Sequence, residues 1–150
     1  MPVDTKPRKS GYNINLASEF HVLSALYRLG LDANETLGNK KAVDIVVVRA
    51  PGDTVTIDVK AVAGRVDWLV GNPEAVPRTN HFVALVSHEG KFEDVSTTPS
   101  VWIVPHERFL PLVRYAKTPS LVRYVSRKEV VETCSDYRNA WGLLGVASVS

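Results

Sequence analysis

The chain has 150 residues, of which 45% are hydrophobic, and its 18 basic and 16 acidic side chains leave a net charge of only +2. A chain of this size buries roughly 70% of the surface of its unfolded form in one domain without disulfides, and the single cysteine, Cys134, excludes an intrachain bridge. No apolar run reaches the ~20 residues of a membrane span, and the N-terminus has no apolar signal-peptide core, so we expect a cytoplasmic protein with no membrane segment.

Residues 1–13 contain prolines and basic side chains but no apolar periodicity, which predicts a flexible basic lead-in to a single domain over residues 14–150. A solvated tail is the ordinary interpretation of such a segment. A helix is predicted from Ile14, because apolar residues then recur at three- and four-residue spacing, and Gly30 provides its end.

Three strands are predicted next. Residues 32–37 are typical of an edge strand, and residues 43–49 and 54–60 form two stronger strands rich in valine and isoleucine. Between the latter two, Ala50-Pro51-Gly52-Asp53 has the composition of a turn, which predicts a β-hairpin.

The second half of the chain mixes strands and helices. Residues 61–80 indicate a loop with a short strand or helix, whereas residues 81–87 and 101–104 are apolar runs typical of buried strands. Helices are predicted over residues 106–115 and 137–144. A further helix is predicted to begin at the capping pattern Ser126-x-x-Glu129. This order predicts an α/β or α+β fold with one mixed central sheet flanked by helices.

Charged residues occur on the hairpin where apolar ones would be expected. Along residues 54–60, Asp58 and Lys60 alternate with buried-type residues, so they share one face of the strand. Asp44 lies at the start of the preceding strand. A carboxylate in a central strand loses hydration unless a cation or hydrogen-bond donors replace it.

The loop of the hairpin decides whether Asp44 and Asp58 can meet. An odd loop would put Asp44 opposite Asp58 or Lys60 on the same face, with Cβ atoms ~5 Å apart if directly opposite. An even loop would put the two aspartates on opposite faces unless a β-bulge intervened. The turn sequence leaves these options open.

Glu19 lies in the apolar stripe of the first helix, three residues after Leu16 and four before Leu23. Its carboxylate is therefore expected to point towards the sheet. Three acids and a lysine near a sheet would hold Mg²⁺, or Mn²⁺ in its place, because Mg²⁺ prefers one or two carboxylates with waters and substrate phosphate. The metal would activate water, and Lys60 would orient that water or stabilise the developing charge.

Glu19 on a first helix, Asp44 opening a strand, and Ile57-Asp58-Val59-Lys60 on its hairpin partner resemble the PD-(D/E)xK, or restriction-endonuclease-like, nuclease superfamily. The resemblance covers roughly residues 16–87. It implies an αβββαβ core and an endonuclease that hydrolyses phosphodiester bonds in DNA. It further implies that Asp44 and Asp58 ligate the metal, that Glu19 assists directly or through water, and that Lys60 serves the attacking water.

The sequence departs from that pattern at two positions, since Val43 replaces the proline and Ala61 follows Lys60 where some branches have glutamine. The resemblance also implies a homodimer, because cutting both strands usually needs two active sites. Residues expected to contact DNA phosphates near the site are Lys40, Lys41, Arg65 and Arg78.

The four histidines, His21, His81, His88 and His106, lack metal-ligand spacing and are not expected to be catalytic. Two other functions remain open. One is a catalytically inactive domain of the same fold that binds nucleic acid or a protein partner. The other is a structural α/β domain in which the charged residues form an ordinary ion-pair network.

Overall fold

The structure, a computed structural model, describes residues 10–36, 43–72, 76–117 and 119–145. A central sheet contains five strands in the order β1-β2-β3-β5-β6. These strands are Asp32–Glu35 (β1), Ile45–Ala50 (β2), Asp53–Val62 (β3), His81–Ser87 (β5) and Ser100–Pro105 (β6). A smaller sheet, β4-β8-β7, is formed by Trp68–Val70, Leu121–Val125 and Val113–Lys117. The helices are Gly11–Arg28 (α1), His106–Phe109 (α2), Arg127–Thr133 (α3) and Gly142–Gly145 (α4), with 3₁₀ turns at Leu110–Leu112 and Ser135–Tyr137.

Helix α1 begins three residues before the predicted start. The Ser10 hydroxyl accepts a hydrogen bond from the Asn13 backbone N–H at 3.3 Å, which caps the helix and draws residues 11–13 into its first turn. The helix ends where predicted, because Gly30 adopts a φ of 80°. The rest of the predicted lead-in, residues 1–9, lies outside the described residues.

The predicted hairpin and the edge position of β1 are confirmed. Strands β1 and β2 pair antiparallel, as do β2 and β3. Strand β3 then pairs parallel with β5 over seven residue pairs, from Thr56↔His81 to Val62↔Ser87, and β5 pairs antiparallel with β6. The sheet is therefore mixed, and β3 lies at its centre.

The hairpin contains a bulge. Ala50 pairs with Asp53 across the two-residue turn Pro51-Gly52, but Val48 pairs with Thr54, so Arg49 is the extra residue. The Arg49 guanidinium donates a hydrogen bond to the Asp53 carboxylate across the turn, with Nη2 at 2.8 Å from Oδ1. This contact holds the bulged residue against its partner strand.

The second sheet differs from what the sequence predicted. In the connection from β3 to β5, the described residues hold strand β4, which agrees with the short strand predicted as one option over residues 61–80, whereas the αβββαβ unit has a helix there. The helix predicted over residues 106–115 is a single turn of α2 and a 3₁₀ turn, because Val113 already pairs with Val125 as the first residue of β7. Strand β8 pairs with both β4 and β7, so the backbone groups of these segments bond between strands and not within a helix.

The C-terminal helices are confirmed in part. Ser126 caps α3, since its hydroxyl accepts the Glu129 N–H at 3.3 Å. The helix predicted over residues 137–144 is interrupted, because Arg138 forms a β-bridge with Trp102 and the Asn139 N–H donates to the Val101 carbonyl. Because the backbone of Arg138 and Asn139 bonds to the edge of β6, it cannot form the hydrogen bonds of a helix there.

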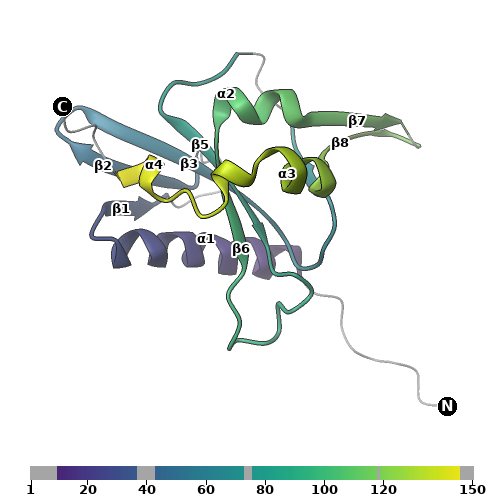
Figure 1. Cartoon of the computed structure of the whole chain (residues 1–150), viewed down its shortest axis with the longest axis horizontal. Coiled ribbons are helices and arrows are strands. Elements are labelled where there is room, and N and C mark those ends of the chain that lie inside the picture. Colours follow the sequence, from purple (N-terminus) through teal and green to yellow (C-terminus); the bar gives the residue numbers. More distant parts are fainter. Residues whose placement is uncertain (1–9, 37–42, 73–75, 118, 146–150) are drawn as a thin grey trace.

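Two hydrophobic layers cover the two faces of the central sheet, and Figure 1 shows α1 along one side and α2, α3, β7 and β8 on the other. The α1 side contains, among others, Val22, Leu26, Ile45, Ile57 and Val59. The second side contains, among others, Trp68, Val83, Trp102, Phe109 and Val130. The protein thus has the predicted mixed α+β fold with a mixed central sheet flanked by helices. None of the helices in the described ranges has the length and apolar character needed to cross a membrane.

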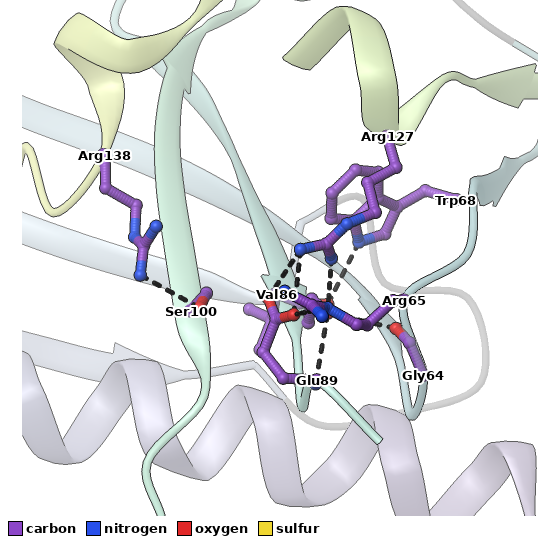
Figure 2. A network of polar contacts seen from close by, with 9 residues as sticks. Gly64, Arg65, Trp68, Val86, Glu89, Ser100, Arg127 and Arg138 are labelled. Atoms are coloured by element: carbon purple, nitrogen blue, oxygen red, sulfur yellow. Dashed lines mark hydrogen bonds and ion pairs between the residues drawn. The ribbon is translucent and has the colours of Figure 1, made fainter. Parts of the chain in front are cut away.

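A polar network joins α3 to the end of β5 (Figure 2). The Glu89 carboxylate accepts hydrogen bonds from Arg127, at 2.8 and 3.0 Å, and from Arg65 at 3.0 Å. Arg127 also donates to the Ser87 hydroxyl at 3.0 Å. Burial raises the pKa of Glu89, but Arg127, Ser100 and Arg65 together outweigh burial and hold that pKa below its usual value.

Candidate active site

Asp58 and Lys60 project from the same face of β3, as the alternation predicted. Their buried neighbours Ile57 and Val59 pack on the α1 side, so the two charged residues lie on the side of the second layer. Both line a cavity of about 90 Å³ that is also bordered by Gly71, Asn72, His106 and Phe109. About a quarter of the Asp58 side chain, 24%, is exposed, which leaves the carboxylate accessible to a small ligand.

Asp44 lies immediately before β2 and is bonded to β3 on both sides of Asp58. Its backbone N–H donates to the Ile57 carbonyl at 3.0 Å, and its Oδ2 accepts the Val59 N–H at 2.7 Å. A two-residue turn without a bulge would have set Asp44 opposite Val59. With the bulge at Arg49, the register Ile45↔Ile57, continued by one residue, leads to Asp44 and Asp58.

Cationic and polar groups surround the Asp58 carboxylate. His81 Nε2 lies 3.2 Å from Asp58 Oδ2, and Arg78 Nη2 lies 3.7 Å from the same oxygen. Burial raises the pKa of Asp58, but the hydrogen bond and charge of His81, and the charges of Lys60 and Arg78, bring that pKa below its usual value. Asp58 is therefore an anion at neutral pH.

Two histidines hold the segment that carries Arg78. His81 Nδ1 lies 2.7 Å from the Thr56 hydroxyl, and its Nε2 lies 3.0 Å from Arg78 Nη2. His106 Nδ1 accepts the backbone N–H of Arg78 at 2.8 Å. The rings of His81 and His106 pack edge to face, with their centroids 4.8 Å apart. The side chains around Asp58 thus form one connected cluster.

Glu19 is buried, with 6% of its surface exposed, which agrees with the predicted direction of its side chain. However, it lies on α1, whose buried residues Val22 and Leu26 cover the face of the sheet opposite to Asp58. Among the residues that the structure describes, no three His, Cys, Asp or Glu side chains are grouped closely enough to hold a metal ion. The structure therefore brings Asp44, Asp58 and Lys60 together on the hairpin and leaves Glu19 in the helical layer.

The predicted phosphate-contacting residues fall into three places. Arg78 lies at the site, with about one third of its side chain exposed. Arg65 is largely exposed and pairs with Glu89 in the polar network of Figure 2. Lys40 and Lys41 lie outside the described residues.

Sequence reasoning missed His81, Thr56 and His106 as parts of this site. Thr56 was visible as the residue two before Asp58 on the same face of the strand. His81 had a weaker signal, as a polar side chain at the start of a strand that is otherwise apolar. The parallel pairing of β3 with β5, which sets Thr56 beside His81, had no local signal.

Comparison with known proteins supports the fold. No protein-family model and no curated protein matches this chain. Among solved structures, the chain is similar to a bacterial homing endonuclease, I-Ssp6803I, with a TM-score of 0.52 and 16% sequence identity. The similarity covers 89% of this chain and 90% of that one, so nearly the whole chain shares the fold of that endonuclease.

Proposed function

We propose that this chain, whose fold is that of a homing endonuclease, is a magnesium-dependent endonuclease that hydrolyses phosphodiester bonds in DNA. One observation carries the proposal. Asp44 is bonded to β3 on both sides of Asp58, and Lys60 lies two residues further along the same face. These contacts support two acids and an amine acting together on the central strand of the sheet.

The donor chemistry of this site fits a hard divalent cation. Two aspartates supply the one or two carboxylates that Mg²⁺ usually takes from a protein, the remaining positions being water and substrate phosphate. The lowered pKa of Asp58 supports this assignment, because a metal ligand must be ionised. Asp44 and Asp58 would hold Mg²⁺, with Mn²⁺ as a substitute, and the metal would supply an activated water and neutralise phosphate charge.

The other residues of the chain would serve the substrate. Lys60 would orient the attacking water or stabilise the charge that develops on the phosphorus oxygens. Arg78, which is partly exposed beside Asp58, would contact a phosphate. Arg65 would provide a phosphate contact farther along the surface, and cleavage of both strands would be carried out by a homodimer.

The decisive experiment measures nicking of plasmid, branched and single-stranded DNA in Mg²⁺ or Mn²⁺. Asp58→Asn and Lys60→Met should each abolish cleavage and leave DNA binding by electrophoretic mobility shift largely intact. Thr54→Ala is the matched control, because Thr54 lies on the same face of β3 but outside the cluster. Unchanged cleavage in both site variants would refute the assignment.

One observation favours a second function, a catalytically inactive domain of this fold that binds nucleic acid or a protein partner. Asp58 already has two side-chain partners, since the Arg78 guanidinium and the His81 ring lie within 4 Å of its carboxylate. If these contacts are structural, the purified protein will bind DNA without cleaving it, and Asp58→Asn will lower its stability.

A further inference from the structure

His81 is the most deeply buried polar side chain next to the site, with none of its side chain exposed. The register of β3 and β5 pairs it with Thr56, and its ring reaches along β3 to Asp58. Nδ1 lies 2.7 Å from the Thr56 hydroxyl and Nε2 lies 3.2 Å from Asp58 Oδ2. One buried ring therefore connects two side chains on the same face of β3.

Two groups compete for Nε2. Arg78 Nη2 lies 3.0 Å from it, and a guanidinium only donates hydrogen bonds, whereas the Asp58 carboxylate only accepts them. In a neutral imidazole, Nε2 bonds to Arg78 when it carries no proton and bonds to Asp58 when it carries one. The Thr56 hydroxyl either donates or accepts, so it satisfies Nδ1 in both tautomers.

We propose that His81 is a positioning residue that orients the Asp58 carboxylate for its ligand, and that a DNA phosphate couples to this role by binding Arg78. A phosphate on Arg78 gives the guanidinium another acceptor. Nε2 then carries the proton and donates to Asp58 Oδ2, while Thr56 donates to Nδ1. Substrate binding thereby fixes the orientation of a metal ligand. This inference rests on the proposed function.

Metal affinity provides the first test, because it needs no cleavage. Mn²⁺ binding to the full chain is measured by calorimetry for wild type, His81→Phe and His81→Gln. Phenylalanine fills the space without a donor, and glutamine keeps an N–H near the position of Nε2. Loss of a hydrogen bond to a ligating carboxylate typically weakens metal binding 10- to 100-fold, so we expect about a tenfold loss in His81→Phe and recovery in His81→Gln.

His88→Phe is the matched control. His88 lies directly after β5, its Nε2 lies 2.8 Å from the Ser18 hydroxyl and its ring packs edge to face on Phe92, so it is a partly buried histidine outside the site. Equal loss of Mn²⁺ affinity in His88→Phe and His81→Phe would overturn the proposal, as would wild-type affinity in folded His81→Phe. If His81→Phe fails to fold, Thr56→Val gives the same test, because it removes only the hydroxyl that holds Nδ1.

The tautomer of His81 provides the second test. Long-range ¹H–¹⁵N spectra of histidine-labelled protein, assigned with His81→Gln, are recorded without divalent metal, with and without a short DNA duplex. We expect the duplex to shift His81 towards the tautomer protonated at Nε2, and Arg78→Gln to abolish that shift. A ring that stays protonated at Nδ1 when DNA is bound would contradict the coupling.

These readouts separate the inference from the proposed function. A wild-type protein that binds Mn²⁺ and shows the His81 effects but never cleaves DNA would refute the nuclease activity and leave the positioning role supported. In an active protein, His81→Phe should raise the Mn²⁺ concentration needed for half-maximal cleavage about tenfold, with KM for DNA unchanged at saturating Mn²⁺. A wild-type protein without any Mn²⁺ affinity would refute both proposals.

Discussion

The carboxylate of Asp44 accepts a hydrogen bond from the backbone N–H of Val59, with 2.7 Å between the two atoms. Val59 is itself buried in the layer under α1, so this single contact attaches a proposed metal ligand to the core of the protein. Asp44 thus has a structural role that is separable from a role in metal binding, and the two roles respond differently to substitution.

Asp44→Asn should retain the fold and lose the metal. The amide oxygen of asparagine accepts the Val59 N–H in place of the carboxylate, but the amide is a far weaker ligand for Mg²⁺. Asp44→Ala removes the acceptor as well and should lower the free energy of unfolding by about 1–3 kcal/mol, the cost of an unsatisfied buried donor. Chemical denaturation and DNA cleavage of both variants give the comparison. Equal stability of the two variants would contradict the structural role of this contact.

Binding of Mn²⁺ should stabilise the folded protein against heat. A ligand at 100 times its Kd contributes about 2.7 kcal/mol by mass action, which for a chain of this size corresponds to a rise in Tm of roughly 5–10 °C. Asp58→Asn should remove this rise, whereas Thr54→Ala should retain it. Thermal unfolding with and without Mn²⁺ provides the measurement, and an equal rise in Asp58→Asn would place the metal elsewhere.

The Glu89 carboxylate should make stability depend on pH. Its pKa in the folded protein is lowered by Arg127, Ser100 and Arg65 relative to the ordinary value of 4.5, so its contribution is present above that value and is lost as the pH falls through the lower folded value. Glu89→Gln should therefore be less stable than wild type at pH 7, by about 1–2 kcal/mol, and the difference should shrink below about pH 4.5. Urea unfolding from pH 7 to pH 3 provides the test, with the exposed Glu132→Gln as control.

Trp68 should be important for stability and not for nucleic-acid binding. Its side chain is fully buried, and its Nε1–H donates to the Val86 carbonyl at 3.0 Å. Its ring packs edge to face on Trp102, with the ring centroids 5.8 Å apart. Trp68→Phe leaves that carbonyl without its donor and creates a void, which should cost about 2–3 kcal/mol in unfolding free energy. Guanidinium unfolding compared with Trp141→Phe, a half-buried tryptophan of the other layer, gives the readout. A difference below 0.5 kcal/mol, about the noise of such comparisons, would refute this assignment.

The parts of the fold that local patterns determine were predictable. Alternation identified β3 and the shared face of Asp58 and Lys60, and turn chemistry at residues 50–53 identified the hairpin. The second sheet was not predictable, because β4 and β8 pair across more than fifty residues of sequence and each strand is short. A three- to five-residue strand carries too few alternations to be distinguished from a loop.

The candidate site also has one part that the sequence could predict and other parts that it could not. The Asp44–Asp58 relationship depends on one hairpin, so the sequence could define its options, although not the bulge that selects between them. The approach of His81 and Arg78 to Asp58 depends on the parallel pairing of two strands separated by a long connection. The position of Glu19 on the opposite face depends on the packing of α1, since a helical stripe shows that a side chain points inward but not which face of the sheet it meets.

The bulge at Arg49 lets the hairpin tolerate the loss of one residue at that position but not elsewhere in β2. Without Arg49, Val48 and Ala50 would be adjacent and would keep their partners Thr54 and Asp53, so the rest of the ladder would be unchanged. Because successive side chains of a strand alternate between faces, a one-residue deletion between Ile45 and Val48 would instead turn Ile45 out of the hydrophobic layer under α1. Asp44 would lose its place beside Asp58 at the same time, so such a deletion would damage the fold and the candidate site together.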